Sequence, residues 1–202
     1  MTELTRLVNS PGASSLPYVD PMFPNRPLVL HVARPRQYDA ATPVLFVHHG
    51  VNRNGAEYRD YWLDLVDEAC ILAISIEFPE ASFPEYLWYN SGNLHAKDST
   101  PNPRETWTFG IDERLFEELR ARGITIHQSY GLFGHSAGGQ YVHRMFVLWI
   151  SRPRCRRRQR QCRHLRNAGS GDTMAVWPRR DQCRYRRTAR IACLSNNGDG
   201  GH

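Results

Sequence analysis

The segment from residue 131 to residue 146, GLFGHSAGGQYVHRMF, constrains the fold of this chain more than any other. Its first residues, with Tyr130 before them, form a short apolar run that is typical of a buried strand, whereas Gln140 to Ile150 form an apolar helical stretch. Small residues join the two around Ser136. Because strand and helix come close together at such a junction, bulky side chains do not fit there. We therefore expect a strand, a sharp turn with Ser136 at its tip, and a helix.

This turn has the pattern G-x-S-x-G, which is typical of a nucleophilic serine. Gly134 and Gly138 lie two residues before and two residues after Ser136. At the start of a helix, free backbone N–H groups and the positive end of the helix dipole point toward any oxyanion formed at the serine. The N–H of Ala137 is one expected donor. The pattern predicts that Ser136 is a nucleophile for acyl transfer.

The chain before this turn alternates apolar strands with helical segments. Strands are predicted at residues 27–35, 43–50 and 71–79, and helices at 54–70 and 111–123. In the first helical segment, one face is expected to hold Tyr58, Tyr61, Trp62, Leu65, Val66 and Ala69. Such alternation predicts an α/β fold with a mostly parallel sheet, covered by helices on both faces. We expect this sheet to be incomplete at its C-terminal side.

Two motifs carry a resemblance to a known family: LFVHHGVNRNGAEYRD from residue 45, and GHSAGGQYVHRM from residue 134. They resemble the α/β-hydrolase superfamily, in particular esterases similar to polyhydroxybutyrate depolymerases, over about residues 25 to 150. The resemblance implies that Val51 or Asn52 supplies a second oxyanion N–H, just past the His49–Gly50 pair. It further implies cleavage of a small-molecule ester through an acyl-enzyme, without a metal or an organic cofactor.

Two other features near these motifs have less specific interpretations. We expect His48 and His49 to be packing and turn residues at the end of a strand rather than groups that transfer protons. The segment 80–110 is too long for a plain connection. Its aromatic residues Trp88, Tyr89 and Trp107 either cover an acyl-binding pocket or provide ordinary packing.

A nucleophilic serine needs a histidine base and an acid that orients this base. In α/β hydrolases both follow the serine, the acid before the histidine. The downstream candidates are Asp172, Asp181, Asp199, His143, His164 and His202. His143 lies seven residues past Ser136 on the same helix, about 10 Å along its axis, which is too far for a hydrogen bond. We assign a catalytic role to none of them, so we expect weak or absent activity.

The composition changes abruptly after residue 150. Residues 151–202 contain 14 arginines, no lysine and three acidic residues, a net charge of eleven positive; residues 1–150 have a net charge of five negative. Few residues of this tail are large and aliphatic: Leu165, Val176, Ile191 and Leu194. A segment so charged and so poor in apolar residues cannot offset its ordering entropy. We divide the chain into residues 1–150, the N-terminal half of a hydrolase domain, and a tail, 151–202, that is disordered or out of frame.

An out-of-frame tail is our preferred explanation, because frame-shifted reading of GC-rich, Ala-rich DNA gives an Arg-rich, Lys-free product. With suitable codons, the segment from Cys155 to Ala168 reads one nucleotide later as an Ala-rich strand and turn. We therefore predict a frameshift between about Leu148 and Cys155.

Two further readings of the tail are weaker. As an alternative function, the basic tail binds polyanions or nucleic acid, and we expect such binding to be non-specific because interleaved aromatic residues are missing. The spacings of Cys155, Cys162, Cys183 and Cys193 fit no paired zinc knuckle.

Cys70 is expected to be a buried thiol. Without a signal-peptide pattern or an apolar run long enough for a membrane span, the chain is expected to be cytoplasmic.

Overall fold

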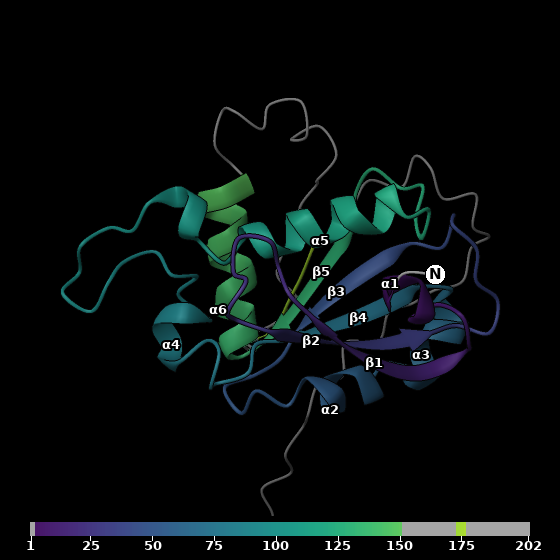
Figure 1. The fold of residues 1–202 in the computed structure, drawn as a ribbon. Helices are drawn as coiled ribbons and strands as arrows, with labels where there is room; N and C mark the ends of the chain where they lie inside the picture. Colours follow the sequence, from purple (N-terminus) through teal and green to yellow (C-terminus); the bar gives the residue numbers. More distant parts are fainter. Residues whose placement is uncertain (1–2, 151–172, 177–202) are drawn as a thin grey trace, which may run out of the picture.

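The computed structural model describes residues 3–150 and 173–176. Its centre is a six-stranded sheet with the order β1-β2-β4-β3-β5-β6 (Figure 1). The strands are β1 Gly12–Tyr18, β2 Leu28–Arg34, β3 Val44–His48, β4 Leu72–Glu77, β5 Gly131–His135 and β6 Thr173–Val176. The helices are α1 Glu3–Arg6, α2 Gly55–Asp60, α3 Leu63–Ala69, α4 Glu85–Trp88, η1 Arg104–Thr106, α5 Gly110–Ala121, α6 Ala137–Arg144 and the π-helical η2 Met145–Ile150.

The sheet is parallel in its centre and antiparallel toward both edges. β3 runs parallel to β4 on one side and to β5 on the other. The pairs β1–β2, β2–β4 and β5–β6 are antiparallel. The predicted α/β class is thus confirmed, and the parallel strands are those that carry the predicted site.

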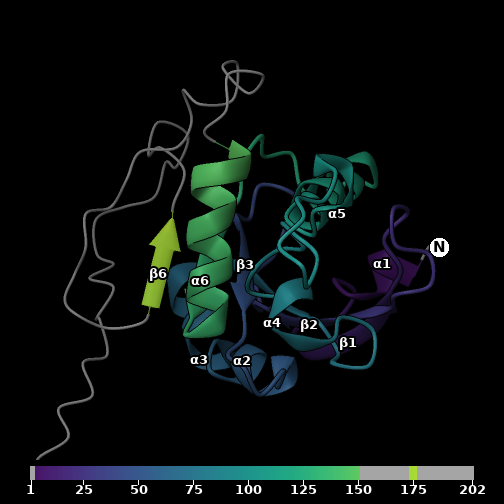
Figure 2. The ribbon, with the colours of Figure 1, turned by 90° about the vertical axis from the view of Figure 1, so that its left-hand side faces the viewer.

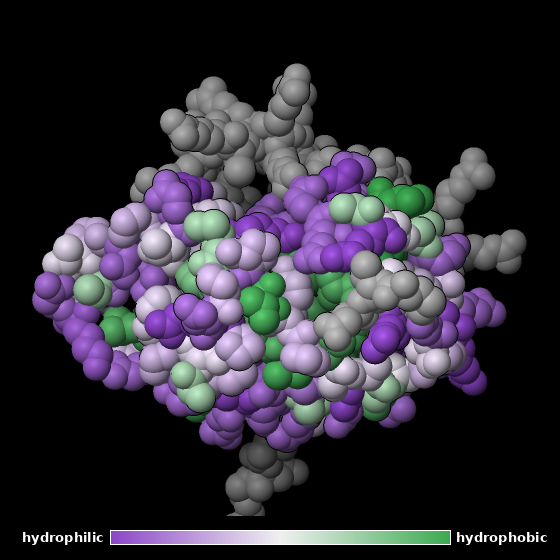
Figure 3. Space-filling model, viewed as in Figure 1, coloured by the Kyte–Doolittle hydropathy of each residue, from purple (hydrophilic) through white to green (hydrophobic). Residues whose placement is uncertain are grey.

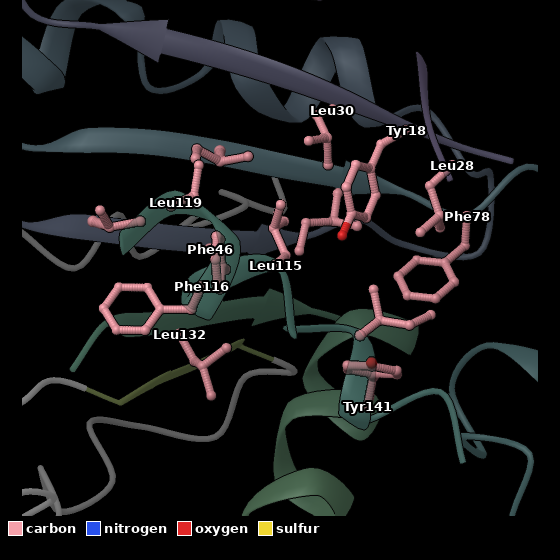
Figure 4. Packing of buried hydrophobic residues seen from close by; sticks show 14 of the residues in the cluster. Tyr18, Leu28, Leu30, Phe46, Phe78, Leu115, Phe116, Leu119, Leu132 and Tyr141 are labelled. Carbon is pink, nitrogen blue, oxygen red and sulfur yellow. The ribbon is translucent and has the colours of Figure 1, made fainter. Parts of the chain in front are cut away.

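Helices cover both faces of this sheet, as predicted. On one face, Leu115, Phe116 and Leu119 of α5 pack with strand residues such as Phe46 and Leu132 in the larger core (Figure 4). The opposite face carries a smaller core, and Leu45 of β3 and Val66 of α3 both belong to it. Figure 2 shows α2 and α3 on the side of the sheet away from α5. Successive residues of β3 enter different cores because side chains alternate along a strand.

The predicted helix at 54–70 is two helices, and its predicted apolar face was wrong in part. α2 ends at Asp60 and α3 begins at Leu63. Val66 is buried, but Tyr61 and Leu65 are 60% and 42% exposed. The reason is the break between α2 and α3, because a single helical period no longer runs through both segments.

Strand β1 was not predicted. Its sequence GASSLPY contains a proline and several polar residues, and its burial alternates along the strand. Such a sequence is compatible with an edge strand, where one side of the backbone has no partner strand and proline is tolerated. β1 occupies that place at one end of the sheet order.

In the tail, the structure describes β6 alone, which pairs in the register Leu132↔Val176 with β5. The sequence did not predict this strand. The expectations about the frameshift, the tail cysteines and polyanion binding fall largely outside the described residues. On the face in Figure 3, hydrophobic residues lie scattered among hydrophilic ones. None of the described helices is long and apolar enough to cross a membrane.

Candidate active site

The predicted strand, turn and helix around Ser136 are present. β5 ends at His135, α6 begins at Ala137, and Ser136 between them has φ 52° and ψ −116°. Residues other than glycine rarely adopt a positive φ, and such strain concentrates at functional sites. The Ser136 residue is half-buried, so the turn presents it at the rim of the sheet.

Close packing explains the two glycines that flank this serine. A Cβ atom on Gly134 would overlap the carbonyl group of Gly138. A Cβ atom on Gly138 would in turn overlap the carbonyl oxygens of His48 and His49. The first turn of α6 is therefore pressed against the end of β3, which is the contact that a larger residue would prevent.

The same contact brings the end of β3 next to the turn at Ser136. His48 pairs in register with Gly134, so the two parallel strands end side by side and the chain from His49 onward leaves the sheet next to the turn at Ser136. The N–H of Arg53 donates to the Gly50 carbonyl over 3.3 Å, which closes a tight turn around Val51 and Asn52. Both residues are exposed. We call residues 49–53, which include the two predicted oxyanion donors, the oxyanion loop.

His49 fixes the start of the oxyanion loop. Its Nδ1 donates to the Gly50 carbonyl over 2.8 Å, and its Nε2 accepts from the Phe78 N–H over 3.0 Å. The Tyr89 hydroxyl donates to the His49 carbonyl over 2.6 Å. Burial lowers the pKa of His49 to about 3, so the imidazole is neutral at neutral pH. These contacts agree with the expected packing and turn role.

Arg53 fixes the end of the oxyanion loop. Its guanidinium donates to the carbonyl groups of Phe78, Phe83 and Glu85 over 2.8–3.2 Å. The guanidinium also lies 4.5 Å from the centre of the Tyr89 ring. One side chain thus joins the oxyanion loop to the segment that follows β4. Sequence reasoning missed this role, because nothing distinguishes Arg53 from a surface arginine.

His48 belongs to a second buried arrangement behind the site. Its Nε2 lies 3.4 Å from Oδ1 of Asp112, and both side chains are fully buried. The imidazole also packs against the Tyr141 ring of α6 at a centroid distance of 4.5 Å. The His48–Asp112 pair therefore links β3, α5 and α6. Asp112 stands in the first turn of α5, where acidic residues are common because of the helix dipole, so its place in the sequence does not reveal this contact.

The aromatic residues of segment 80–110 contribute to packing. Tyr89 is 1% exposed and stacks on Tyr141, while Trp88 packs against Phe23 and lies beneath the Arg26 guanidinium. Trp107 lies 6.4 Å from Trp149, between ring centroids.

The segment is also hydrogen-bonded to the helix that follows Ser136. Asn90 Nδ2 donates to Gln140 Oε1 over 2.9 Å, and Arg144 donates to the Asn90 carbonyl over 2.7 Å. In Figures 1 and 2, α4 accordingly lies beside α6. Segment 80–110 is thus held against the candidate active site by α6 and Arg53.

No base for Ser136 is found among residues 3–150 and 173–176. Within that part, the Ser136 hydroxyl has no hydrogen bond to a histidine or an acid. His135 is adjacent, but its Nδ1 is 2.7 Å from the Tyr58 hydroxyl. His143 is exposed on α6. The other candidates, Asp172, Asp181, Asp199, His164 and His202, lie outside the described residues.

Two further expectations concern cysteine and metal. Cys70 is half-buried at the end of α3, with its thiol 3.5 Å from the Asp67 carbonyl, rather than fully buried. The described residues contain no cluster of histidine, cysteine and acidic side chains that could hold a metal ion.

Solved structures of known hydrolases share this fold. Poly(aspartic acid) hydrolase-1 from Sphingomonas sp. KT-1 is 36% identical and matches with a TM-score of 0.65 over 70% of this chain. LpqC, a poly(3-hydroxybutyrate) depolymerase from Bordetella parapertussis, is also 36% identical, with a TM-score of 0.65 over 72% of this chain. The matches cover 53% and 49% of those two proteins, so this chain spans about half of their length.

A more distant match shows the fold alone. An S-formylglutathione hydrolase from Agrobacterium tumefaciens is 12% identical, with a TM-score of 0.53, and the match covers 71% of this chain and 56% of that protein. No protein-family model and no curated protein sequence matches the chain. Together with the turn at Ser136, the structural matches place the chain in the α/β-hydrolase superfamily. Within this superfamily it resembles the poly(3-hydroxybutyrate) depolymerase-like hydrolases.

Proposed function

We propose that this chain carries the nucleophile half of a serine hydrolase that cleaves small-molecule carboxylic esters. The observation that carries the proposal is the strained Ser136 between β5 and α6, with the oxyanion loop next to it. The names of the two proteins at 36% identity, a poly(aspartic acid) hydrolase and a poly(3-hydroxybutyrate) depolymerase, support hydrolysis of acyl bonds.

In this proposal, Ser136 Oγ attacks the ester carbonyl carbon and the alcohol leaves, which gives an acyl-enzyme that water then hydrolyses. The N–H of Ala137 and that of Val51 or Asn52 donate to the oxyanion. His49 and Arg53 position the second donor, because they hold both ends of the oxyanion loop. Because residues 3–150 and 173–176 place no base at hydrogen-bond distance from Ser136, we expect turnover to be at most weak and to depend on the oxyanion site and substrate binding.

The test uses covalent labelling, because it reads out the nucleophile even where turnover is slow. The full chain is treated with an alkyl fluorophosphonate, and the modified serines are identified by peptide mass spectrometry. We expect Ser136 to be labelled at least about tenfold faster than Ser82, because a phosphonyl adduct at Ser136 places its oxygen where the N–H donors stabilise negative charge. Ser82 is a suitable internal control, since it is a partly exposed loop serine near the same region.

A matched pair of variants completes the experiment. Ser136→Ala is expected to remove the adduct and to lower hydrolysis of p-nitrophenyl butyrate, and Ser82→Ala is expected to change neither. Equal labelling of Ser136 and Ser82 would contradict the assignment of Ser136 as the nucleophile.

A further inference from the structure

Three polar side chains form a serine–histidine–acid arrangement that does not include Ser136 and lies far from it in the sheet order. They are Ser15 on β1, His31 on β2 and Glu77 at the end of β4, three strands that lie next to one another (Figure 1). Ser15 and His31 are direct cross-strand partners. His31 pairs with Ser75, two residues before Glu77, so all three side chains belong to the same face of the sheet.

The distances in this arrangement are those of a catalytic relay. Ser15 Oγ lies 2.7 Å from Nδ1 of His31, and Nε2 of His31 lies 3.0 Å from Oε2 of Glu77. The same carboxylate oxygen accepts the N–H of Gly55 over 2.9 Å. A nucleophile within hydrogen-bond distance of a base, with a third group that orients the base, is the general signature of an activated serine.

The charge on Glu77 decides which nitrogen of His31 carries the proton. Burial alone would raise the pKa of Glu77, but the hydrogen bonds from His31 and Gly55 outweigh it and lower this pKa below its usual value. An ionised carboxylate can only accept, so Nε2 of His31 must donate to it. In the neutral imidazole, Nδ1 is then the acceptor of the hydrogen bond from the Ser15 hydroxyl. This is the tautomer that a general base requires.

The serine, the histidine and the acid differ in their exposure to solvent. The His31 residue is 8% exposed, and the side chain of Glu77 is 22% exposed. A Cβ atom on Gly55 at the start of α2 would lie 3.0 Å from the His31 ring, so α2 shields the base from this side. Ser15 itself is exposed on the edge strand. The base is therefore protected while the hydroxyl is accessible to a reagent.

A cation lies close to the same serine. The guanidinium of Arg59 donates to the carbonyl of Ser14 over 3.2 Å, one residue from Ser15, and its side chain is 12% exposed. The Nε of Arg59 is paired with Oδ1 of Asp60 over 2.6 Å, so the guanidinium belongs to an ion pair. Its contribution here is to hold the β1 backbone beside Ser15.

We propose that Ser15 is a second nucleophile of this chain, which accepts acyl groups from small activated carboxylic esters. Ser15 Oγ forms a bond to the carbonyl carbon, and its proton passes to Nδ1 of His31. The bond from the carbonyl carbon to the leaving oxygen breaks, and that oxygen takes the proton from His31. The products are Ser15 as a carboxylic ester and the free alcohol. The open edge of the sheet admits small acyl groups such as acetyl.

The experiment uses the full chain with Ser136→Ala, so that the site proposed above does not contribute. The protein is treated with p-nitrophenyl acetate, and acetylation is followed at each serine by tandem mass spectrometry. Ser14 is a matched internal control, because its hydroxyl donates to the Leu7 carbonyl over 3.3 Å and has no histidine partner. We expect Ser15 to be acetylated about 100-fold faster than Ser14, the usual contribution of a general base.

A variant then tests the relay itself. Glu77→Gln keeps the size of the side chain but removes its charge, and we expect acetylation of Ser15 to slow at least about tenfold. Equal acetylation of Ser14 and Ser15 in the Ser136→Ala chain would by itself overturn the proposal, before the Glu77 variant is tested. Faster acetylation of Ser15 that persists in Glu77→Gln would also overturn it, because the acid would then have no part in activation.

Discussion

His48 and His49 are adjacent in the sequence, yet they enter different environments. His49 hydrogen-bonds the oxyanion loop and the backbone of Phe78, whereas His48 faces Asp112 and Tyr141 in the layer beneath α6. Both rings lie near Phe78, at centroid distances of 6.2 and 6.4 Å, but their polar partners differ. Both histidines therefore position and pack neighbouring groups rather than transfer protons.

His49 gives the folded chain a dependence on pH. Its pKa is about 3 in the folded chain against 6.5 as the ordinary value, because burial disfavours the charged imidazole. Between these values the unfolded chain binds more protons at His49, so the free energy of unfolding falls as the pH drops below 6.5. The slope is at most about 1.4 kcal/mol per pH unit, and integrating it gives about 2 kcal/mol between pH 7 and pH 5.

Urea unfolding at pH 7 and pH 5 measures this loss of stability. In the His49→Gln variant, residue 49 does not titrate between pH 7 and pH 5. We therefore expect the loss of stability to be smaller by about 2 kcal/mol in this variant. His143→Gln is the control, because His143 is exposed on α6 and its replacement is expected to leave the pH dependence as it is. The same pH dependence in all three chains would show that His49 titrates normally when folded.

At the scale of elements, Arg53 joins the oxyanion loop to the segment after β4. Arg53→Met keeps the aliphatic part of the side chain but removes the hydrogen bonds to Phe78, Phe83 and Glu85. Hydrogen bonds from a charged donor contribute about 2 kcal/mol. We therefore expect the backbone amides of residues 79–89 to exchange with solvent about thirtyfold faster, measured by hydrogen exchange and mass spectrometry.

Arg36→Met provides the comparison for this variant. The Arg36 side chain is 81% exposed and pairs with Asp67 on the surface. We expect it to leave exchange in residues 79–89 unchanged. Unaltered exchange in Arg53→Met as well would mean that Arg53 does not hold this segment.

The elements that the sequence predicted are those with the strongest local signals. Four apolar runs predicted β2, β3, β4 and β5. The segment 111–123 predicted α5, because it has acidic residues at its start, basic residues near its end and Gly123 after it. β1 was missed because an edge strand needs little apolar sequence. The insertion of β4 between β2 and β3 could not be predicted, since strand order depends on contacts between distant segments.

The candidate site was predictable to a similar degree. The turn at Ser136 follows from small residues at fixed spacing, and that signal is local. The roles of Arg53, Tyr89 and Asp112 depend on partners 25 to 64 residues away in the chain, such as Phe78 for Arg53 and His48 for Asp112. Such pairs become visible only when the strands have been placed side by side.

At the scale of the whole molecule, the change in composition after residue 150 leads to a prediction about the gene. We expect resequencing of the codons from Leu148 to Cys155 to reveal a one-nucleotide change that restores an Ala-rich frame. That frame is expected to continue to an acid and a histidine for Ser136. A confirmed present frame would reject the frameshift, and the basic tail would then need a function of its own.

The backbone at Ser136 has a consequence for the stability of the entire domain. Its φ of 52° is strained for serine but not for glycine, and such strain costs about 1–3 kcal/mol. Glycine loses more backbone entropy on folding than serine, which offsets part of the relieved strain. We therefore expect Ser136→Gly to raise the free energy of unfolding by about 1 kcal/mol. Ser136→Ala retains the strained Cβ and is expected to give no such gain. Urea unfolding of the three chains measures the difference.

Folding by itself therefore favours glycine at position 136. Evolution under a demand for stability alone would have replaced the serine by a single substitution that improves the domain. We therefore take a serine at a position where it weakens the fold as support for the nucleophile that we propose, obtained from one chain without its relatives.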